Sequence, residues 1–237
     1  MSPAKLTAPT NFLLASLPQK EYLNFLSHCK LVELHSDQII GEPGQKISHI
    51  YFPIKCYISL QKKIDAKSSL EIGIVGPQGF YGLNLVLNVG VTLLRAVVEA
   101  SGTALSISSE SFLKICEKNT VLKRKLENYV YVRMSQLSQT TGCNRFHTLD
   151  ARLCRWILMV QDCLQTSEFY ITHECLSKKL GVRRAGVTKA AGILQKKKLI
   201  SYNKGHIKIL DRNKLKALAC ECYRLNKETY KKIICKR

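Results

Sequence analysis

The sequence ITHECLSKKLGVRRAGVTK, residues 171–189, decides the fold because it predicts two short helices joined by a tight turn. Thr172 can cap the first helix, which is expected to run from His173 to Leu180. Gly181 follows, and it adopts the left-handed conformation without a steric penalty, so it can end that helix and form the turn. The stretch therefore predicts a helix-turn-helix.

The second helix is expected from Arg183 to Gln195, with one apolar and one polar face. A helix presented in this way fits the major groove of DNA and reads base edges with its exposed side chains. The apolar positions, which would face the core, are Val187, Ala190, Ala191 and Leu194. The candidate base-reading residues on the other face are Arg183, Arg184, Thr188 and Lys189.

After the second helix, two short apolar runs flank Asn203-Lys-Gly205, which predicts a β-hairpin, the wing of a winged helix. A small helical domain whose hairpin binds another protein is the alternative. The basic character of the uncovered helix favours DNA. The residues expected to contact backbone phosphate are Thr172, His173, Lys196, Lys204 and His206.

The charge of the chain supports a polyanionic partner. The formal net charge is +20, and residues 145–237 carry 22 Lys or Arg against 7 Asp or Glu. Cations that neutralise phosphates release condensed counterions, which favours binding to nucleic acid. An anionic membrane surface would attract the same charge, and a lysine-rich solvated surface is the third interpretation.

The N-terminal half shows short, mostly β-branched apolar runs, which are separated by turn signals such as Gly41-Glu-Pro-Gly44 and Gly76-Pro-Gln-Gly79. Strands at this spacing predict a β-barrel or β-roll. The expected strands lie at 31–34, 38–40, 49–52, 56–60, 70–75, 96–99 and 103–107.

Helical periodicity begins after Ser108, where Ser109 could cap a short helix that ends at Glu117. A longer apolar stripe follows. A long helix with such a stripe often pairs with a copy of itself, although the stripe could also face the core of its own chain. A hinge is expected around 144–147, before a helix capped by Thr148. The stripe residues are Leu122, Leu126, Tyr129, Val130, Leu137 and Thr141.

The ten cysteines are scattered without a Cys-x-x-Cys motif, so no metal site is predicted. Cys220 and Cys222 fit one helix, where residues two apart do not face each other. Most of the thiols are expected to be small buried hydrophobes, and a redox role is the alternative.

No apolar run reaches the roughly 20 residues that span a bilayer. Met1–Thr10 lacks the order of a secretory signal, so a cytoplasmic location without membrane association is expected. The chain shows no Ser-His-Asp set, phosphate-binding loop or paired-carboxylate motif, and it is not expected to be an enzyme.

From Leu13 to about Tyr223 the chain resembles the cyclic-AMP receptor and fumarate-nitrate regulator (Crp/Fnr) superfamily of bacterial transcription factors. GEPGQKISHIYF (41–52) is similar to the first strands of that family's β-roll, and residues 171–189 are similar to its helix-turn-helix. The resemblance implies an α+β fold with a cyclic-nucleotide-binding-like β-roll at 1–118, a dimerisation helix at 119–145 and a winged helix-turn-helix at 146–237. It also implies a homodimer that binds double-stranded DNA and contacts RNA polymerase.

Two departures from the family concern ligands. Members that bind cyclic AMP carry a Gly-Glu pair and a later Arg, whereas this chain has Gly82 followed by Leu83, and Arg95 further on. Leu83 cannot accept the hydrogen bonds of a ribose, which argues against a cyclic nucleotide. Gly82 and Arg95 remain the candidate ligand residues, with the ligand unidentified. Cys29 and Cys56 are too few for the N-terminal cysteine cluster of iron–sulfur members.

A third departure lies in the reading helix. Relative to the family's Arg-Glu pair and later Arg, Arg184 is retained, Ala185 replaces the Glu and Lys189 replaces the second Arg. Arg184 can still bind guanine O6 and N7, and Ala185 could contact a thymine methyl. A DNA site different from the family's familiar half-sites is therefore expected.

The predicted function is a dimeric transcription regulator that reads a palindromic DNA site through the helix Arg183–Gln195. An unidentified ligand in the β-roll could modulate this activity. A nucleoid-type protein that binds DNA broadly, with the roll as scaffold only, is the alternative.

Overall fold

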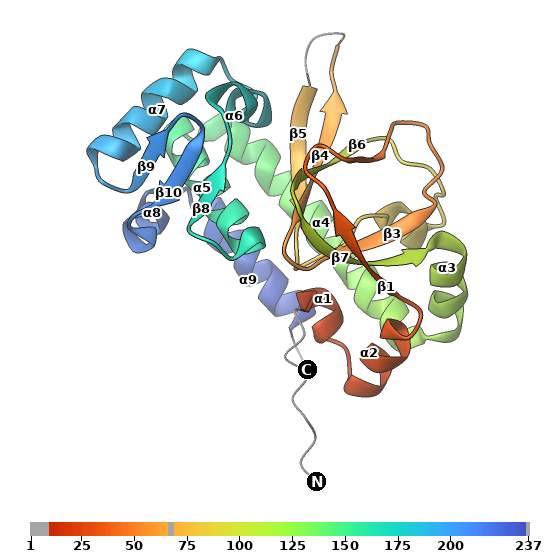
Figure 1. Cartoon of the computed structure of the whole chain (residues 1–237). Coiled ribbons are helices and arrows are strands. Elements are labelled where there is room, and N and C mark those ends of the chain that lie inside the picture. The colour runs from red at the N-terminus through yellow and green to blue at the C-terminus, as the bar shows by residue number, and fades with distance from the viewer. Residues whose placement is uncertain (1–9, 66–68, 236–237) are drawn as a thin grey trace.

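The computed structural model describes residues 10–65 and 69–235, and Figure 1 shows that they form an α+β structure. A β-roll is connected through one long helix to a winged helix-turn-helix, as predicted. Residues 1–9 lie outside the described part, so the expectation about a secretory signal falls almost wholly outside it. Among the described helices, none has the length and apolar character required to cross a membrane.

The roll consists of two antiparallel sheets, with strand orders β1-β7-β3 and β2-β6-β4-β5. Every predicted apolar run forms one of these strands, and only the strand ends differ. The strands are β1 (Lys30–Leu34), β2 (Ile39–Gly41), β3 (His49–Pro53), β4 (Tyr57–Lys63), β5 (Ser69–Val75), β6 (Arg95–Ala100) and β7 (Gly102–Ser108).

The interior of the roll is filled by aromatic side chains. Phe52 stacks on Phe80 with ring centroids 5.1 Å apart, and Phe25 meets Phe52 edge-on at 5.3 Å. All three rings are buried, and each such burial stabilises the fold by about 1.5–3 kcal/mol. The short helices of the roll are α1 (Phe12–Ala15), α2 (Gln19–Leu26), η1 (Leu83–Leu87) and α3 (Ser109–Lys118).

The long helix α4 spans Thr120–Phe146, and the predicted apolar stripe divides along its length. Leu122 and Leu126 are buried in the core of the roll, whereas Leu137 is 40% exposed and Thr141 is also exposed. The first part of the stripe therefore faces the core of its own chain, and only the later part is free for another partner.

The C-terminal part combines four helices with a small sheet of order β8-β10-β9. Apolar side chains from all four helices and the wing form one core, which includes Trp156, Leu176, Val187 and Leu215. Its elements are α5 (Leu149–Leu164), β8 (Glu168–Tyr170), α6 (His173–Leu180), α7 (Arg184–Lys196), β9 (Ile200–Asn203), β10 (His206–Ile209) and α8 (Arg212–Leu218).

Two predicted helix caps differ in detail. Ser108, rather than Ser109, caps α3, because the Ser108 hydroxyl accepts a hydrogen bond from the Ser111 amide at 3.3 Å. Thr148 precedes α5 as predicted, but its side chain forms no capping hydrogen bond. The extended backbone at His147 and Thr148 separates α4 from α5, at the end of the predicted hinge.

The last helix, α9 (Cys222–Ile234), runs back along α4 to the roll, which the sequence did not predict (Figure 1). The Lys125 ammonium donates a hydrogen bond to the Ile234 carbonyl at 2.7 Å, and the Ile234 side chain joins the core of the roll. The assignment of Cys220 and Cys222 to one helix was wrong: α8 ends at Leu218, and Cys220 lies in the junction before α9.

Candidate DNA-binding surface

The first helix of the helix-turn-helix, α6, begins and ends as its sequence predicts. The Thr172 hydroxyl accepts a hydrogen bond from the Cys175 amide at 3.1 Å, which caps the helix. Gly181 ends it with φ of 63°, in the left-handed region that glycine adopts without strain. The Val182 amide then donates to the Ser177 carbonyl at 3.0 Å, so the tight turn satisfies a carbonyl at the helix end.

The second helix, α7, begins one residue later than predicted, because Arg183 occupies its N-cap position. Its four predicted apolar residues are all buried. This packing turns the opposite face outward. The exposed residues on or beside that face are Arg183, Arg184, Ala185, Thr188 and Lys189, all of which the sequence predicted as base-reading candidates.

The cations of this face have no internal partner. Within the described residues, the side chains of Arg183, Arg184 and Lys189 form no hydrogen bond or ion pair. An exposed guanidinium without an internal partner keeps its donors available for a ligand. The face can therefore bind a polyanion without first breaking an interaction of the folded protein.

His173 is held beneath α7 instead of pointing freely into solvent. Its ring stacks on Tyr202 with centroids 4.3 Å apart, and its Nδ1 lies 3.1 Å from the Thr188 hydroxyl oxygen. Burial lowers the pKa of His173, and the nearby positive charge of Arg184 lowers it further. A neutral ring in this place orients Thr188, a role that sequence reasoning missed because Tyr202 lies in the wing.

The wing is a two-residue hairpin between β9 and β10. Lys204 and Gly205 both have positive φ, 45° and 90°, which matches the hairpin turn that follows the twist of the strands. Gly205 is required for space as well, because a Cβ there would lie 2.5 Å from the Tyr170 ring. Lys204 and His206 are exposed at the tip, and Lys196 is exposed at the end of α7.

The other side of α6 carries a buried ionic contact with the roll. Lys179 donates to Glu71 of β5 at 3.0 Å and to Glu99 of β6 at 2.5 Å. The side chains of Lys179 and Glu71 are only 3% and 4% exposed. Burial lowers the pKa of Lys179, but the two carboxylates outweigh it, so the pKa is raised and the amine stays charged.

The carboxylate of Glu71 also binds elements outside α6. It accepts hydrogen bonds from the Trp156 indole at 2.8 Å and from the Ser59 hydroxyl at 2.6 Å. A buried charge of this kind is tolerated only when its lone pairs are satisfied. The contact thus joins α5, α6 and three strands of the roll in one network.

The two candidate ligand residues of the roll, Gly82 and Arg95, have different structural roles. Gly82 has φ of 102° at the start of η1, and a Cβ there would lie 2.4 Å from the Ile50 side chain. Arg95 begins β6, and its Nε forms an ion pair with the Glu42 carboxylate at 3.2 Å. The negative charge of Glu42 beside Arg95 would weaken the attraction of this guanidinium for an anion.

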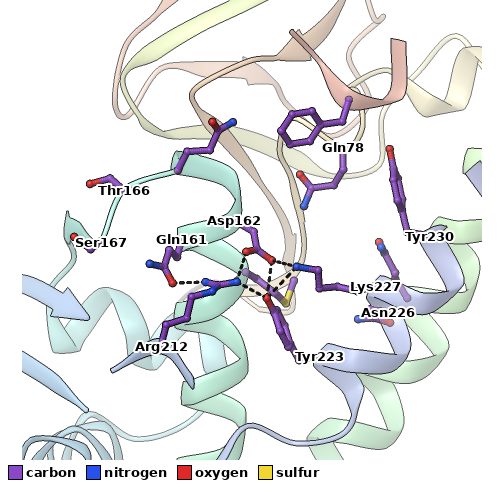
Figure 2. Close-up of a pocket in the computed structure, with 14 residues that line it drawn as sticks. Gln78, Gln161, Asp162, Thr166, Ser167, Arg212, Tyr223, Asn226, Lys227 and Tyr230 are labelled. Atoms are coloured by element: carbon purple, nitrogen blue, oxygen red, sulfur yellow. Dashed lines mark hydrogen bonds and ion pairs between the residues drawn. The ribbon is translucent and has the colours of Figure 1, made fainter. Parts of the chain in front are cut away.

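A cavity of about 630 Å³ lies where α5, α8 and α9 face α1 (Figure 2). Figure 2 shows Asp162 at one side, where it accepts from Arg212 at 2.6 Å, from Tyr223 at 2.8 Å and from Lys227 at 3.1 Å. Burial raises the pKa of Tyr223, and the negative charge of Asp162 raises it further. The polar side chains at this wall are thus paired with one another.

These features define the class of the molecule as a winged helix-turn-helix protein that carries a β-roll. Residues 151–218 match the family model of the Crp-like helix-turn-helix domain. Comparison with curated protein sequences finds no match.

Several solved structures share the fold of this chain. FixK2 of Bradyrhizobium japonicum is 13% identical, with a TM-score of 0.68 over 81% of this chain and 98% of that one. A Crp/Fnr-family regulator of Eubacterium rectale is 17% identical, with a TM-score of 0.66 over 87% and 96%. The c-di-GMP-responsive regulator CLP of Xanthomonas campestris is 14% identical, with a TM-score of 0.64 over 82% and 100%.

At these identities the solved structures show the fold alone. The matched helix-turn-helix model indicates that residues 151–218 are a DNA-binding type of domain. The resemblance predicted from the sequence is confirmed in two respects: residues 151–218 match a Crp-like helix-turn-helix domain, and the chain shares the fold of solved structures that include a Crp/Fnr-family regulator.

Proposed function

We propose that the protein is a homodimer that reads a palindromic DNA site by placing one α7 from each subunit in the major groove. The observation that carries this proposal is the exposed face of α7, whose cations have no internal partner in the described structure. Arg184 would bind guanine through O6 and N7, and Ala185 would contact a thymine methyl. Arg183, Thr188 and Lys189 complete the base-reading set.

The contacts to phosphate would surround this helix. Lys196, Lys204 and His206 are exposed and would lie beside the DNA backbone. Thr172 would offer the N-terminal end of α6 to a phosphate. His173 is assigned a positioning role, because its ring is stacked on Tyr202 and bound to Thr188.

The dimer interface would form along α4. Its outward side carries apolar residues that lie three residues apart, Tyr131, Met134 and Leu137, with exposures of 59%, 62% and 40%. Exposed apolar side chains at helical spacing are typical of a helix that pairs with another helix. We expect wild type to sediment as a dimer and Met134→Glu as a monomer. A wild-type monomer at micromolar concentration would contradict the proposal.

Control by a ligand in the roll is part of the proposal, but cyclic AMP does not fit the roll. Leu83 follows Gly82 where a carboxylate would be needed, and Arg95 is paired with Glu42. We expect millimolar cyclic AMP to leave the affinity for DNA unchanged, measured by fluorescence anisotropy. We further expect the protein in the cytoplasm, with RNA polymerase as its partner at promoters.

The second candidate function is broad coating of DNA, which the net charge of +20 favours. Competition binding separates the two functions. The protein is titrated at one salt concentration with the DNA site that it selects from random duplexes, and with a scrambled duplex of the same composition. A sequence-specific reader is expected to prefer its site by about 10³ or more. A ratio near one would support the coating protein.

A further inference from the structure

Four potential metal ligands from distant parts of the sequence meet at the end of α4. They are Cys143, His147, Cys220 and Cys222, and their ligand atoms all lie within 4.8 Å of one another. The three thiols are buried, and the imidazole is partly buried. None of these four residues belongs to the candidate DNA-binding face or lines the cavity between α1, α5, α8 and α9.

The local structure explains why these side chains converge. Cys143 lies in the last turn of α4 and His147 is its C-cap residue, so the two are four residues apart on one face. Cys220 lies in the junction between α8 and α9, and Cys222 is the first residue of α9. The return of α9 along α4 therefore brings the second pair onto the first.

Two of the distances between ligand atoms match those around a tetrahedral zinc ion. The Sγ atoms of Cys143 and Cys220 are 3.5 Å apart, and the Cys222 Sγ lies 3.4 Å from the His147 Nδ1. Zinc bonds of about 2.3 Å to sulfur and about 2.0 Å to nitrogen place ligands of a tetrahedron about 3.5–3.8 Å apart. A disulfide would need the two sulfurs at about 2.05 Å.

The surroundings favour an anionic centre. Arg152 and Arg155 are buried and interact electrostatically with the thiols of Cys143 and Cys220, and the Nε of each has no hydrogen-bond partner within the described residues. A zinc ion with three thiolates and one neutral imidazole carries one negative charge, which such guanidinium groups would balance. The Gln139 amide also donates to the Cys222 sulfur at 3.0 Å, which orients that ligand.

We propose that Cys143, His147, Cys220 and Cys222 form a structural Cys₃His zinc site that fastens the start of α9 to the end of α4. All four ligand positions are occupied by protein, as in structural rather than catalytic zinc sites. The site would fix the hinge between the dimerisation helix and the DNA-binding part. It does not depend on the proposed DNA sequence specificity.

The metal content of the full chain tests this proposal. The protein is purified without a histidine tag, under reducing conditions, from cells grown with zinc, and its metals are measured by mass spectrometry. About one zinc per chain is expected for wild type. The control Cys235→Ser changes an exposed thiol near the end of α9 and is expected to keep the full zinc content.

Substitutions of the four potential metal-binding residues distinguish a zinc site from a cluster of buried side chains that binds no metal. His147→Ala and Cys222→Ser are expected to lose zinc, whereas His147→Cys, which supplies a fourth thiolate, is expected to retain it. Replacement of zinc by Co²⁺ in wild type should give the visible absorption of a tetrahedral cobalt–thiolate centre.

Two results would overturn the proposal. One is a wild type that contains no zinc and cannot, when fully reduced, withdraw Zn²⁺ from a weakly binding chelating dye. The other is a Cys143–Cys220 disulfide in the freshly isolated protein without zinc, which would make the cluster a redox site. Both are read on wild type, so a variant that fails to fold does not affect them.

Discussion

The helix-turn-helix carries two sets of cations that differ in burial and in ion pairing. Lys179 on α6 is buried, and two carboxylates of the roll surround its amine. Arg183, Arg184 and Lys189 at α7 are exposed, and none has a partner in the described structure. The first set holds the domain against the roll, whereas the second set is available to DNA.

The difference teaches that a high positive charge is not by itself a binding surface. Removal of a buried cation leaves its carboxylates desolvated and unpaired, so its loss is expected to affect stability. Removal of an exposed, unpaired cation leaves the fold intact, so its loss is expected to affect binding only. The two sets can therefore be separated by experiment.

The largest effect is expected for Lys179→Met, which leaves Glu71 and Glu99 buried without their cation. The free energy of unfolding should fall by about 3–5 kcal/mol, measured by urea denaturation. Lys178→Ala is the matched control. Lys178 is the next residue on the same helix, and its amine forms only an exposed ion pair with Glu174. Equal stabilities of the two variants would show that the buried contact does not stabilise the protein.

The next effect is expected for Arg184→Ala, which removes a predicted contact to guanine. Affinity for the specific site should fall by about 1–3 kcal/mol, and specificity at one base pair should relax. The free energy of unfolding should not change. Lys114→Ala, on α3 of the roll, removes an exposed positive charge far from α7 and should leave DNA affinity unaltered. An equal loss of affinity on all sequences would instead assign Arg184 to a phosphate.

A smaller effect is expected for Lys204→Ala at the tip of the wing. Binding should weaken on all sequences alike, and the slope of log affinity against log salt should decrease by about one. The affinity is measured by fluorescence-anisotropy titrations at several salt concentrations. An unchanged slope would place Lys204 away from the phosphates.

The smallest effect concerns His173, whose lowered pKa means that the folded state disfavours protonation. The stability from the neutral ring is complete above the ordinary imidazole pKa of about 6.5 and is lost as the pH falls through the lower folded value. NMR titration should show His173 protonating below the ordinary value. Arg184→Ala should raise that pKa, and a titration unaffected by this substitution would remove Arg184 as a cause.

The sequence predicted those features that depend on neighbouring residues. The cap at Thr172, the turn at Gly181 and the apolar face of α7 all lie within one short stretch, where local rules decide the structure. The strands of the roll were found in the same way, from alternating apolar runs and turn signals.

Features that join distant residues could not be predicted. Lys179 follows Lys178 in the sequence, a pattern typical of a solvated basic run, while its partner Glu71 lies 108 residues away. Cys143 and Cys220 are separated by 77 residues and meet only because α9 returns along α4. A single sequence contains no signal for such tertiary contacts, whereas covariation between positions could show them.

The measurement that tests the central claim most directly is selection of bound sequences from random duplex DNA, with purified protein at near-physiological salt and no added ligand. We expect a palindrome whose half-sites lie about one helical turn apart. We also expect Arg184→Ala to select a site with one relaxed position in each half. Recovery of no preferred sequence by wild type, with affinity still high, would contradict the claim that α7 reads base edges.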